Sequence, residues 1–281
     1  MATVKAALEE GARRLAGAGV ADAQQEAAWL LAHVLHASAG SLRVRSAETL
    51  SADDAARFAA LVDRRSAREP IQYILGTEEF MGLEFTVTPA VLIPRLDTAV
   101  LVEAAVERLG RGAARVADIG TGSGAIAVAV AALLPAVTVV AVDISPDALA
   151  VARQNAERHG VATRIEFRRG DLLVPLAGEL FDAVLSNPPY IDEPEWEGLM
   201  PEVVRWEPKG ALTPGPDGLV MYRRLAAEGP RLLRPGGFLA VEVGYQQAAA
   251  VAELFTTAGM EATVLRDTAG IERVVIGRPL V

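Results

Sequence analysis

The sequence predicts an α/β fold in which a small helical bundle precedes a mostly parallel β-sheet covered by helices on both faces. Apolar residues recur at helical spacing from residue 3 to about residue 68, whereas strand-like runs alternate with helical stretches after residue 94. Between these regions lies a stretch with a near-alternating apolar pattern. We therefore expect an N-terminal helical domain over residues 1–75, a β-hairpin linker over 76–94 and a larger domain over 95–281.

The composition is typical of a cytoplasmic protein. Of the 281 residues 51% are hydrophobic, but no apolar run reaches the ~20 residues that a membrane span needs. The charged N-terminal residues lack the apolar stretch of a signal peptide. The absence of cysteine excludes disulfides and thiolate zinc sites, and three histidines leave little for a metal site. We expect no membrane contact, no metal and, by default, a monomer.

The formal charge of −9 is unevenly distributed. Residues 1–75 contain nine basic and nine acidic side chains, so the rest of the chain carries the whole deficit. A protein that grips duplex DNA usually neutralises several phosphates with a basic stripe. The acidic C-terminal region therefore argues against direct binding of nucleic acid.

The N-terminal region has the pattern of a small bundle of four or five short helices. Apolar residues share one helical face in the segment 27–35, and glycine-containing breaks lie on either side of it. Ser51 is a good helix N-cap, because two acids, Asp53 and Asp54, follow it in the first turn.

The stretch 71–93 changes character, because its apolar residues arrive in near-alternation and Gly76 and Gly82 lie at expected turns. The alternating residues are Phe80, Leu83, Phe85 and Val87. We read this stretch as a β-hairpin that bridges the two domains.

Strands and helices alternate after Pro94, beginning with a helix from Thr98 to about Leu109. The expected strands are residues 115–119, 137–144, 164–170, 181–186 and 237–243, followed by a hairpin of 261–267 and 273–277. Helical stretches or a short loop connect the first four strands, which indicates a mostly parallel sheet covered on both faces.

A glycine-rich loop follows the first of these strands and opens a helical run. Its glycines permit positive φ and let a ligand approach the backbone where a side chain would block it. The spacing is GxGxG, which differs from the GxGxxG of dinucleotide enzymes and lacks the GK[ST] ending of a P-loop. The candidate cofactor-binding residues here are Asp118, Gly120, Thr121, Gly122, Ser123 and Gly124.

Two acids stand at the ends of the next two strands. Asp143, which Ile144 follows, lies where an acid in a doubly wound sheet accepts hydrogen bonds from both hydroxyls of a ribose. Asp171 can accept a hydrogen bond from an adenine amino group, with Leu172 packed against the ring. Taken singly, each acid fits a solvated turn residue or a cap better. Together with the glycine-rich loop, however, they place candidate residues at the ends of three strands, and this arrangement favours a bound ligand.

The segment Asn187-Pro188-Pro189-Tyr190 stops the fourth strand abruptly, at the edge where open α/β sheets bind ligands. Asn187 can offer its side-chain oxygen and Pro188 its main-chain oxygen to an incoming NH₂ group, while Tyr190 supplies a flat wall. We therefore read residues 187–190 as a receptor for an amide or amine, and as the candidate catalytic and substrate-binding residues. Asn187 is also a candidate cofactor-binding residue.

The chain resembles the HemK/PrmC family of release-factor glutamine methyltransferases, within the class I S-adenosylmethionine-dependent methyltransferases. The matching segments, in order, are PIQYILGTEEFMGLEF, VLIPR, VADIGTGSGAIAVA, AVDIS, SNPPYI, EVVRWEPKGAL, DGLVMYRRL and GGFLAVEVG. The NPPY segment alone would also suit adenine-specific DNA methyltransferases. The discriminating parts are the hairpin region before VLIPR and the WEPKGAL…DGL segment after NPPY.

The resemblance implies a Rossmann-like, seven-stranded class I methyltransferase sheet and a five-helix N-terminal domain that helps to engage a release factor. It implies that the loop 120–124 contacts the methionine part of S-adenosylmethionine, Asp143 the ribose, and Asp171 with Leu172 the adenine. Residues 187–190 would hold the glutamine of a Gly-Gly-Gln loop in a peptide chain release factor. The expected activity is therefore methylation of that glutamine on its side-chain amide nitrogen.

Two departures from the family pattern affect these assignments. Leu96 and Asp97 stand where many members have Pro-Glu, so the acid is shorter by one methylene. Leu172 occupies a position that can be aromatic, which leaves apolar packing in place of stacking.

Three other functions remain open at this point. They are methylation of a glutamine in a ribosomal protein, adenine methylation of nucleic acid, and a non-catalytic binding module. We also note that Trp196 and Trp206 flank a segment that either covers the substrate or packs on the surface.

Overall fold

The computed structural model describes residues 2–215 and 217–280 and divides the chain into two compact units. The first unit runs to Gly76 and also includes Met200–Trp206, a short segment from much later in the chain. The second unit covers Thr77–Leu199 and continues from Glu207. The sequence did not predict that residues 200–206 belong with the first unit.

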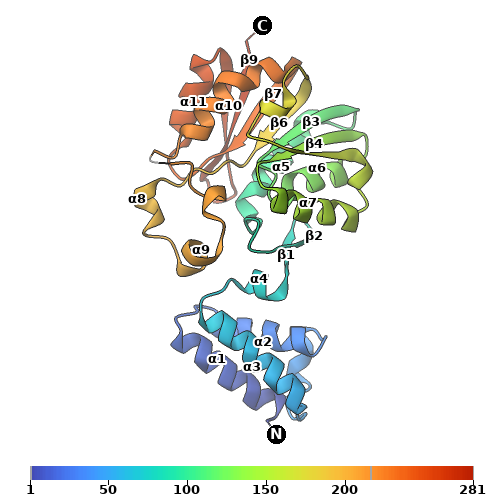
Figure 1. The fold of residues 1–281 in the computed structure, drawn as a ribbon, viewed down its shortest axis with the longest axis vertical. Coiled ribbons are helices and arrows are strands. Elements are labelled where there is room, and N and C mark those ends of the chain that lie inside the picture. The colour runs from blue at the N-terminus through green and yellow to red at the C-terminus, as the bar shows by residue number, and fades with distance from the viewer. Residues whose placement is uncertain (1, 216, 281) are drawn as a thin grey trace. The chain divides into compact units, whose positions relative to one another are not determined.

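The first unit is a bundle of short helices around an apolar core (Figure 1). Its elements are α1 (Val4–Gly17), α2 (Ala23–Val34), the 3₁₀ helix η1 (Ala39–Arg43), α3 (Ala52–Ser66), α4 (Ile71–Leu75) and α9 (Pro201–Trp206). The Ser51 hydroxyl accepts a hydrogen bond from the Asp54 backbone N–H at 3.0 Å, which confirms the predicted N-cap of α3. Leu15, Leu30 and Leu31 are fully buried in the core.

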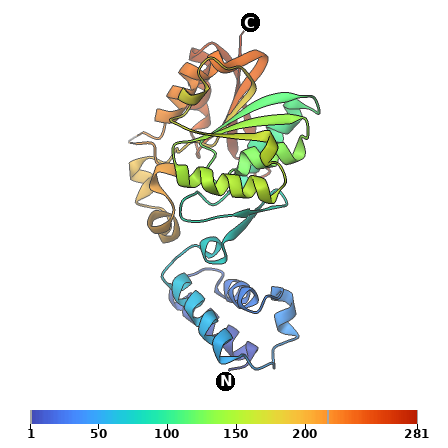
Figure 2. The same cartoon turned by 45° about the vertical axis from the view of Figure 1, so that its right-hand side comes forward.

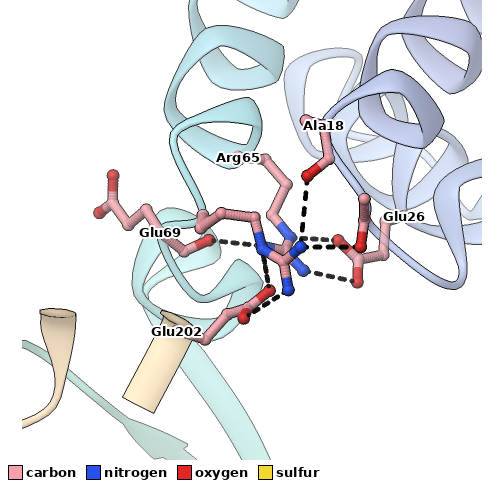
Figure 3. A network of polar contacts seen from close by, with 7 residues as sticks. Ala18, Glu26, Arg65, Glu69 and Glu202 are labelled. Atoms are coloured by element: carbon pink, nitrogen blue, oxygen red, sulfur yellow. Dashed lines mark hydrogen bonds and ion pairs between the residues drawn. The ribbon is translucent and has the colours of Figure 1, made fainter. Parts of the chain in front are cut away.

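A buried ion-pair network holds α9 within this unit (Figure 3). Arg65 on α3 is hydrogen-bonded to the Glu26 carboxylate on α2, and its Nη1 lies 2.9 Å from Glu202 Oε1 on α9. Arg68 donates to both oxygens of Glu202, at 2.8 and 2.7 Å, and to the Gly19 carbonyl at 2.7 Å. The Arg65 side chain is only 7% exposed, so its charge depends on these acids for compensation.

Replacement of Arg65 by alanine should destabilise the first unit by about 3 kcal/mol or more, because Glu26 and Glu202 would be left partly buried without that partner. Hydrogen exchange of α1–α3 amides in the full chain, followed by mass spectrometry, measures the local free energy of unfolding. The matched control is Arg14→Ala, which breaks an ion pair with Asp63 that is largely exposed and contributes about 1 kcal/mol or less. Equal protection in both variants would show that the network adds no stability.

The hairpin in the stretch 71–93 is shorter than the sequence pattern predicts. It consists of β1 (Thr77–Phe80) and β2 (Leu83–Thr86), paired antiparallel, whereas Ile71–Leu75 forms the helix α4. Pro70 stands at the N-cap of α4, and Gly76, with φ of 81°, ends it in the left-handed conformation. The hairpin lies within the predicted linker 76–94, whereas the helix α4 was not predicted, because a single helical turn between a proline and a glycine lacks the length that makes periodicity visible.

The hairpin belongs to the core of the second unit. Phe80 and Phe85 are 1% and 0% exposed, and their rings meet edge to face with centroids 6.1 Å apart.

We expect Phe85→Ala to lower the free energy of unfolding of this unit by about 3 to 5 kcal/mol, the cost of a cavity at a buried aromatic residue. Denaturant unfolding of the full chain measures it, with Val174→Ala, at a side chain that is 63% exposed, as the control. Similar midpoints for the two variants would contradict this assignment.

The second unit contains a seven-stranded sheet in the order β5-β4-β3-β6-β7-β9-β8. The strands are β3 (Ala114–Ile119), β4 (Val137–Asp143), β5 (Ile165–Arg169), β6 (Phe181–Ser186), β7 (Leu233–Glu242), β8 (Met260–Arg266) and β9 (Glu272–Pro279). The first five pair in parallel, and β9 runs antiparallel to both β7 and β8. The predicted strands and the closing hairpin are confirmed.

Helices cover both faces of this sheet, as Figures 1 and 2 show. One face packs against α5 (Ala99–Leu109), α6 (Ala125–Leu133) and α7 (Pro146–Arg158), and the other against α10 (Val220–Glu228) and α11 (Ala248–Thr257). The remaining short elements are η2 (Leu96–Thr98), η3 (Ala162–Arg164), η4 (Val174–Leu176), α8 (Glu193–Trp196), η5 (Lys209–Ala211) and η6 (Gly229–Leu232). Among the described residues, no helix has both the length and the apolar character needed to cross a bilayer.

Candidate active site

The candidate site residues meet at one edge of the sheet. Because β3, β4, β5 and β6 are parallel, their carboxyl ends lie at the same edge. The chain moves outward from β3 through β4 to β5 and then returns to the other side of β3 with β6. Ligands of open α/β sheets bind in the crevice where the strand order reverses in this way. The fold therefore brings the glycine-rich loop, the two acids and residues 187–190 to the expected edge.

The glycine-rich loop turns tightly between β3 and α6. Gly120, Gly122 and Gly124 have φ of 72°, 55° and 82°, values that residues with a Cβ rarely adopt. The backbone N–H groups of Gly120 and Thr121 both donate to the Val142 carbonyl, at 2.8 and 3.0 Å. A Cβ built on Gly120 meets no atom within 4 Å, so the space beside the loop is open.

Asp118 lies behind this loop and not at its surface. Its Oδ2 accepts hydrogen bonds from the Thr121 hydroxyl at 2.6 Å and from the Ala127 N–H at 3.1 Å. The residue is 0% exposed, and burial raises the pKa of its carboxyl group to about 7. Asp118 thus fixes the loop to the first turn of α6, and Asn155 fixes it to α7 by donating to the Ser123 carbonyl at 2.9 Å.

Asp143 is at the end of β4, beside the loop. Its Oδ2 accepts from the Gly122 N–H and its Oδ1 from the Ser145 N–H, both at 2.9 Å. Ile144 follows with 66% of its surface exposed, which provides an apolar face next to the carboxylate. The Ser145 hydroxyl accepts from the Ala148 N–H at 3.2 Å and so caps α7.

Asp171 has a partner that the sequence did not reveal. Both of its carboxylate oxygens accept from the Arg224 guanidinium on α10, at 3.0 and 2.7 Å, and these bonds lower the pKa of the carboxyl group. Leu172 has a positive φ of 47° and packs partly buried against the core. The expected contact of Asp171 and Leu172 with an adenine stays a prediction.

Residues 187–190 follow β6 and are fixed by hydrogen bonds on both sides. The Asn187 Nδ2 donates to the Thr98 Oγ1 at 3.1 Å. The Tyr190 N–H donates to the Leu212 carbonyl at 3.0 Å, and the Tyr190 carbonyl accepts from Gln247 Nε2 at 2.9 Å. Burial raises the pKa of the Tyr190 phenol to about 12, so it stays neutral.

Gly244 permits a close approach to Tyr190. A Cβ built on Gly244 would lie 2.8 Å from Tyr190 Cδ2 and 2.8 Å from the side-chain oxygen of Gln247. A larger residue at position 244 would therefore displace the aromatic wall.

A pocket of about 30 Å³ lies beside this segment. Its lining residues are Leu92, Arg95, Asn187, Pro188, Pro189, Tyr190, Ala211 and Leu212. Arg95 Nη2 donates to Glu207 Oε1 at 2.6 Å, and burial raises the pKa of Glu207. This pair joins the VLIPR and WEPKGAL segments next to the pocket, a contact that no sequence pattern indicates.

Glu242 is a further site residue that sequence reasoning missed. It ends β7, is 2% exposed, and burial raises the pKa of its carboxyl group to about 7. Thr98 and Asn187 act on this carboxyl group in the opposite sense and lower its pKa. The only sequence signal is its position, because an acid at the end of an otherwise apolar strand is costly to bury without a function.

Two further features named in the sequence analysis are Asp97 and the segment between Trp196 and Trp206. Asp97 Oδ2 lies 2.9 Å from Arg273 Nη2 on β9, so this acid has an ionic partner at the edge of the sheet. The Lys209 ammonium lies 5.4 Å from the centre of the Trp196 ring, a cation–π contact. Covering of a substrate by this segment stays a prediction.

Comparison with known proteins gives the family. A protein of Geobacter sulfurreducens called release factor glutamine methyltransferase is 47% identical over 277 residues, covering 98% of this chain and 96% of its own length. The chain belongs to the release factor glutamine methyltransferase family. A second member, from Moorella thermoacetica, is 48% identical over 274 residues and covers 96% of both chains.

Two family models match separate parts of this methyltransferase. The PrmC N-terminal domain model matches residues 6–76, and the methyltransferase small domain model matches residues 94–215. The resemblance that the sequence motifs indicated is thereby confirmed.

Solved structures share the fold. The hMettl16 catalytic domain superposes with a TM-score of 0.58 at 17% identity, covering 82% of this chain and 83% of its own. A methyltransferase from Pyrococcus furiosus gives a TM-score of 0.53 at 19% identity, over 70% of this chain and 89% of its own. The predicted α/β methyltransferase fold is confirmed by these neighbours and by the strand order of the sheet.

Proposed function

We propose that this protein transfers a methyl group from S-adenosylmethionine to the side-chain amide nitrogen of the glutamine in the Gly-Gly-Gln motif of peptide chain release factors. Membership of the family supports the reaction and the class of substrate. The observation that carries the proposal at the site is the orientation of Asn187. Its amide nitrogen is bonded to Thr98, so its Oδ1 is left as an acceptor beside the pocket.

The glycine-rich loop and the acids beside it fit S-adenosylmethionine. The space beside Gly120, where a Cβ would meet nothing within 4 Å, leaves room for the methionine part. The Asp143 carboxylate retains acceptor capacity for two ribose hydroxyls, and Ile144 offers an exposed apolar surface to a base. When bound, the sulfonium supplies an electrophilic methyl group that needs no metal.

Asp118 would act on the cofactor through the loop. Its contacts are with Thr121 and Ala127, and its 0% exposure keeps its carboxyl group away from solvent. We therefore propose that Asp118 positions the loop 120–124. The sequence had suggested a direct contact with the cofactor instead.

The chain's own residues position the glutamine amide. The amide nitrogen is a poor nucleophile because its lone pair is delocalised into the carbonyl group. Asn187 Oδ1 and the Pro188 carbonyl would each accept one amide hydrogen, direct the nitrogen towards the methyl group and stabilise the positive charge that develops on it. Tyr190 stays neutral at physiological pH and provides the wall of the pocket. The proton lost after transfer goes to water in this scheme.

We propose that the first unit helps to recognise the release factor, since it contains the PrmC N-terminal domain that the family model matches over residues 6–76. We also propose that the protein works as a monomer and binds no nucleic acid directly. The charge of −9 supports the second statement.

The test is methyl transfer followed by mass spectrometry. Unmethylated release factor, ribosomal protein and an adenine-containing duplex are each incubated with the protein and S-adenosylmethionine. We expect one methyl group on the Gly-Gly-Gln glutamine and none on a release factor with Gln→Ala at that position. Transfer only to the ribosomal protein or the duplex would reject the partner. No transfer to any of the three would reject the catalytic assignment.

A further inference from the structure

A buried carboxyl group that the proposed reaction does not use lies beside Asn187. Glu242 is 2% exposed, and its Oε2 has no hydrogen-bond partner within residues 2–215 and 217–280. Ser186 pairs with Val241 between β6 and β7, so Asn187 and Glu242 are the next residues on neighbouring parallel strands. Burial of a carboxyl group is costly unless hydrogen bonds offset it. Its place next to the substrate pocket therefore indicates a function there.

Thr98 connects Glu242 to Asn187. Thr98 is 4% exposed, and its Oγ1 accepts from the Asn187 Nδ2 at 3.1 Å. Thr98 and Asn187 are also among the groups that lower the pKa of the Glu242 carboxyl group, against the effect of its burial. A hydroxyl group has one hydrogen, and it goes to the carboxylate as the stronger acceptor, so the Thr98 oxygen remains to accept from Asn187. The Asn187 amide nitrogen is thus directed to Thr98, and in the arrangement that we infer the Glu242 carboxyl group accepts its second hydrogen.

We propose that Thr98 and Glu242 are positioning residues for methyl transfer, because together they determine that Asn187 presents its oxygen to the substrate amide. This inference rests on the proposed function. It adds two residues from separate segments, the start of α5 and the end of β7, to the machinery that binds the glutamine.

The opposite orientation of Asn187 would be unfavourable on both sides. Rotation of the amide by 180° would place Oδ1 against the Thr98 oxygen and the Glu242 carboxylate, which are both acceptors. The NH₂ group would then face the substrate NH₂ group, and two donors would meet. With Thr98 and Glu242 in place, the acceptor needed by the substrate is oriented before the substrate arrives.

The surrounding structure holds Glu242 in this position. The Tyr222 hydroxyl donates to the Glu242 carbonyl at 2.9 Å, and the Val243 N–H donates to the Arg273 carbonyl at 2.8 Å. Asp97 and Arg273 are the charged groups that act on the carboxyl group from outside the network. The backbone at the end of β7 is therefore fixed independently of the Thr98 contact.

Paired substitutions at Thr98 test the proposal. Thr98→Val keeps the shape of the side chain but removes the hydroxyl group, and we expect about a tenfold lower kcat for methylation of the release factor, the effect of one lost hydrogen bond. Thr98→Ser keeps the hydroxyl group and should retain kcat to within about threefold. S-adenosylmethionine affinity should change less than about twofold in both, since Thr98 has no predicted contact with the cofactor.

A double-mutant cycle separates positioning from a merely structural role. In an Asn187→Ala background, Thr98→Val should alter single-turnover transfer by less than about twofold, because the group it orients is gone. A tenfold loss in both backgrounds would show that Thr98 acts independently of Asn187 and would overturn the proposal.

Glu242 is tested by two replacements of similar size. The Gln in Glu242→Gln has an oxygen that can accept from Thr98 and Asn187, so kcat should stay within about fivefold. Glu242→Leu has no acceptor and should lose at least tenfold. Equal losses would mean that charge or proton transfer at Glu242 is required, and positioning would be rejected. If the unmodified protein methylates only the ribosomal protein, the proposed function fails, and the same variants measured on that substrate still decide the inference.

Discussion

Asn187→Ala should lower kcat for methylation of a release factor by roughly 10²-fold or more, as the loss of a preorganised polar group in an active site does. The variant loses the acceptor for one hydrogen of the substrate amide and the group that directs the nitrogen to the methyl donor. Binding of S-adenosylmethionine should remain within about threefold, because Asn187 holds the acceptor side of the site and its nitrogen points to Thr98.

Single-turnover transfer and calorimetric titration with the cofactor measure these two quantities separately. Asn155, the chain's other asparagine, is no matched control because it is fully buried and holds Thr86 and Ser123. Cofactor affinity serves as the control for folding instead. A near-normal rate with intact cofactor binding would reject the role of Asn187, whereas a parallel loss of both would indicate a displaced loop.

The strands and the glycine-rich loop could be predicted because their signals are local. A short strand-like stretch, residues 115–119, followed by Gly120, Gly122 and Gly124 favours a strand that turns into a helix through positive φ. The parallel arrangement then follows from the helical connections, and with it the common edge at which the candidate residues lie.

The contacts that complete the site could not be predicted, because they join residues far apart in the chain. Thr98 and Glu242 meet Asn187 only through the pairing of β6 with β7 and the packing of α5. The Arg95–Glu207 pair likewise spans separate segments. In the sequence alone, each of these residues looks like an ordinary polar surface residue. Only its burial in the folded chain marks it as part of the site.

The short helix α4 and the segment 200–206 were missed for a related reason. A single turn such as Ile71–Leu75 carries too few residues for periodicity, so its proline and glycine ends determine it. The place of Met200–Trp206 with the first unit depends on Arg65 and Arg68 meeting Glu202, and a charge pattern in one sequence does not reveal its partners.

Asp143→Ala should weaken the binding of S-adenosylmethionine by about 10²-fold. The carboxylate would accept from two ribose hydroxyls, and each hydrogen bond to a charged group contributes about 1.5 to 3 kcal/mol. The same substitution removes the acceptor for the Gly122 N–H, so the loop 120–124 loses a constraint as well. Asp143→Asn, which keeps one acceptor, should have an intermediate affinity.

The matched control for Asp143→Ala is Asp147→Ala, which removes an exposed acid in the first turn of α7. It changes the net charge by the same amount, so a general electrostatic effect on the cofactor would appear in both variants. Calorimetric titration should give an affinity for Asp147→Ala within about twofold of the unmodified protein. If Asp143→Ala binds the cofactor as tightly as the unmodified protein does, the assignment of Asp143 to the ribose is rejected. If saturating cofactor restores methyl transfer in Asp143→Ala, then Asp143 acts on cofactor binding, whereas Asn187 acts on the transfer step.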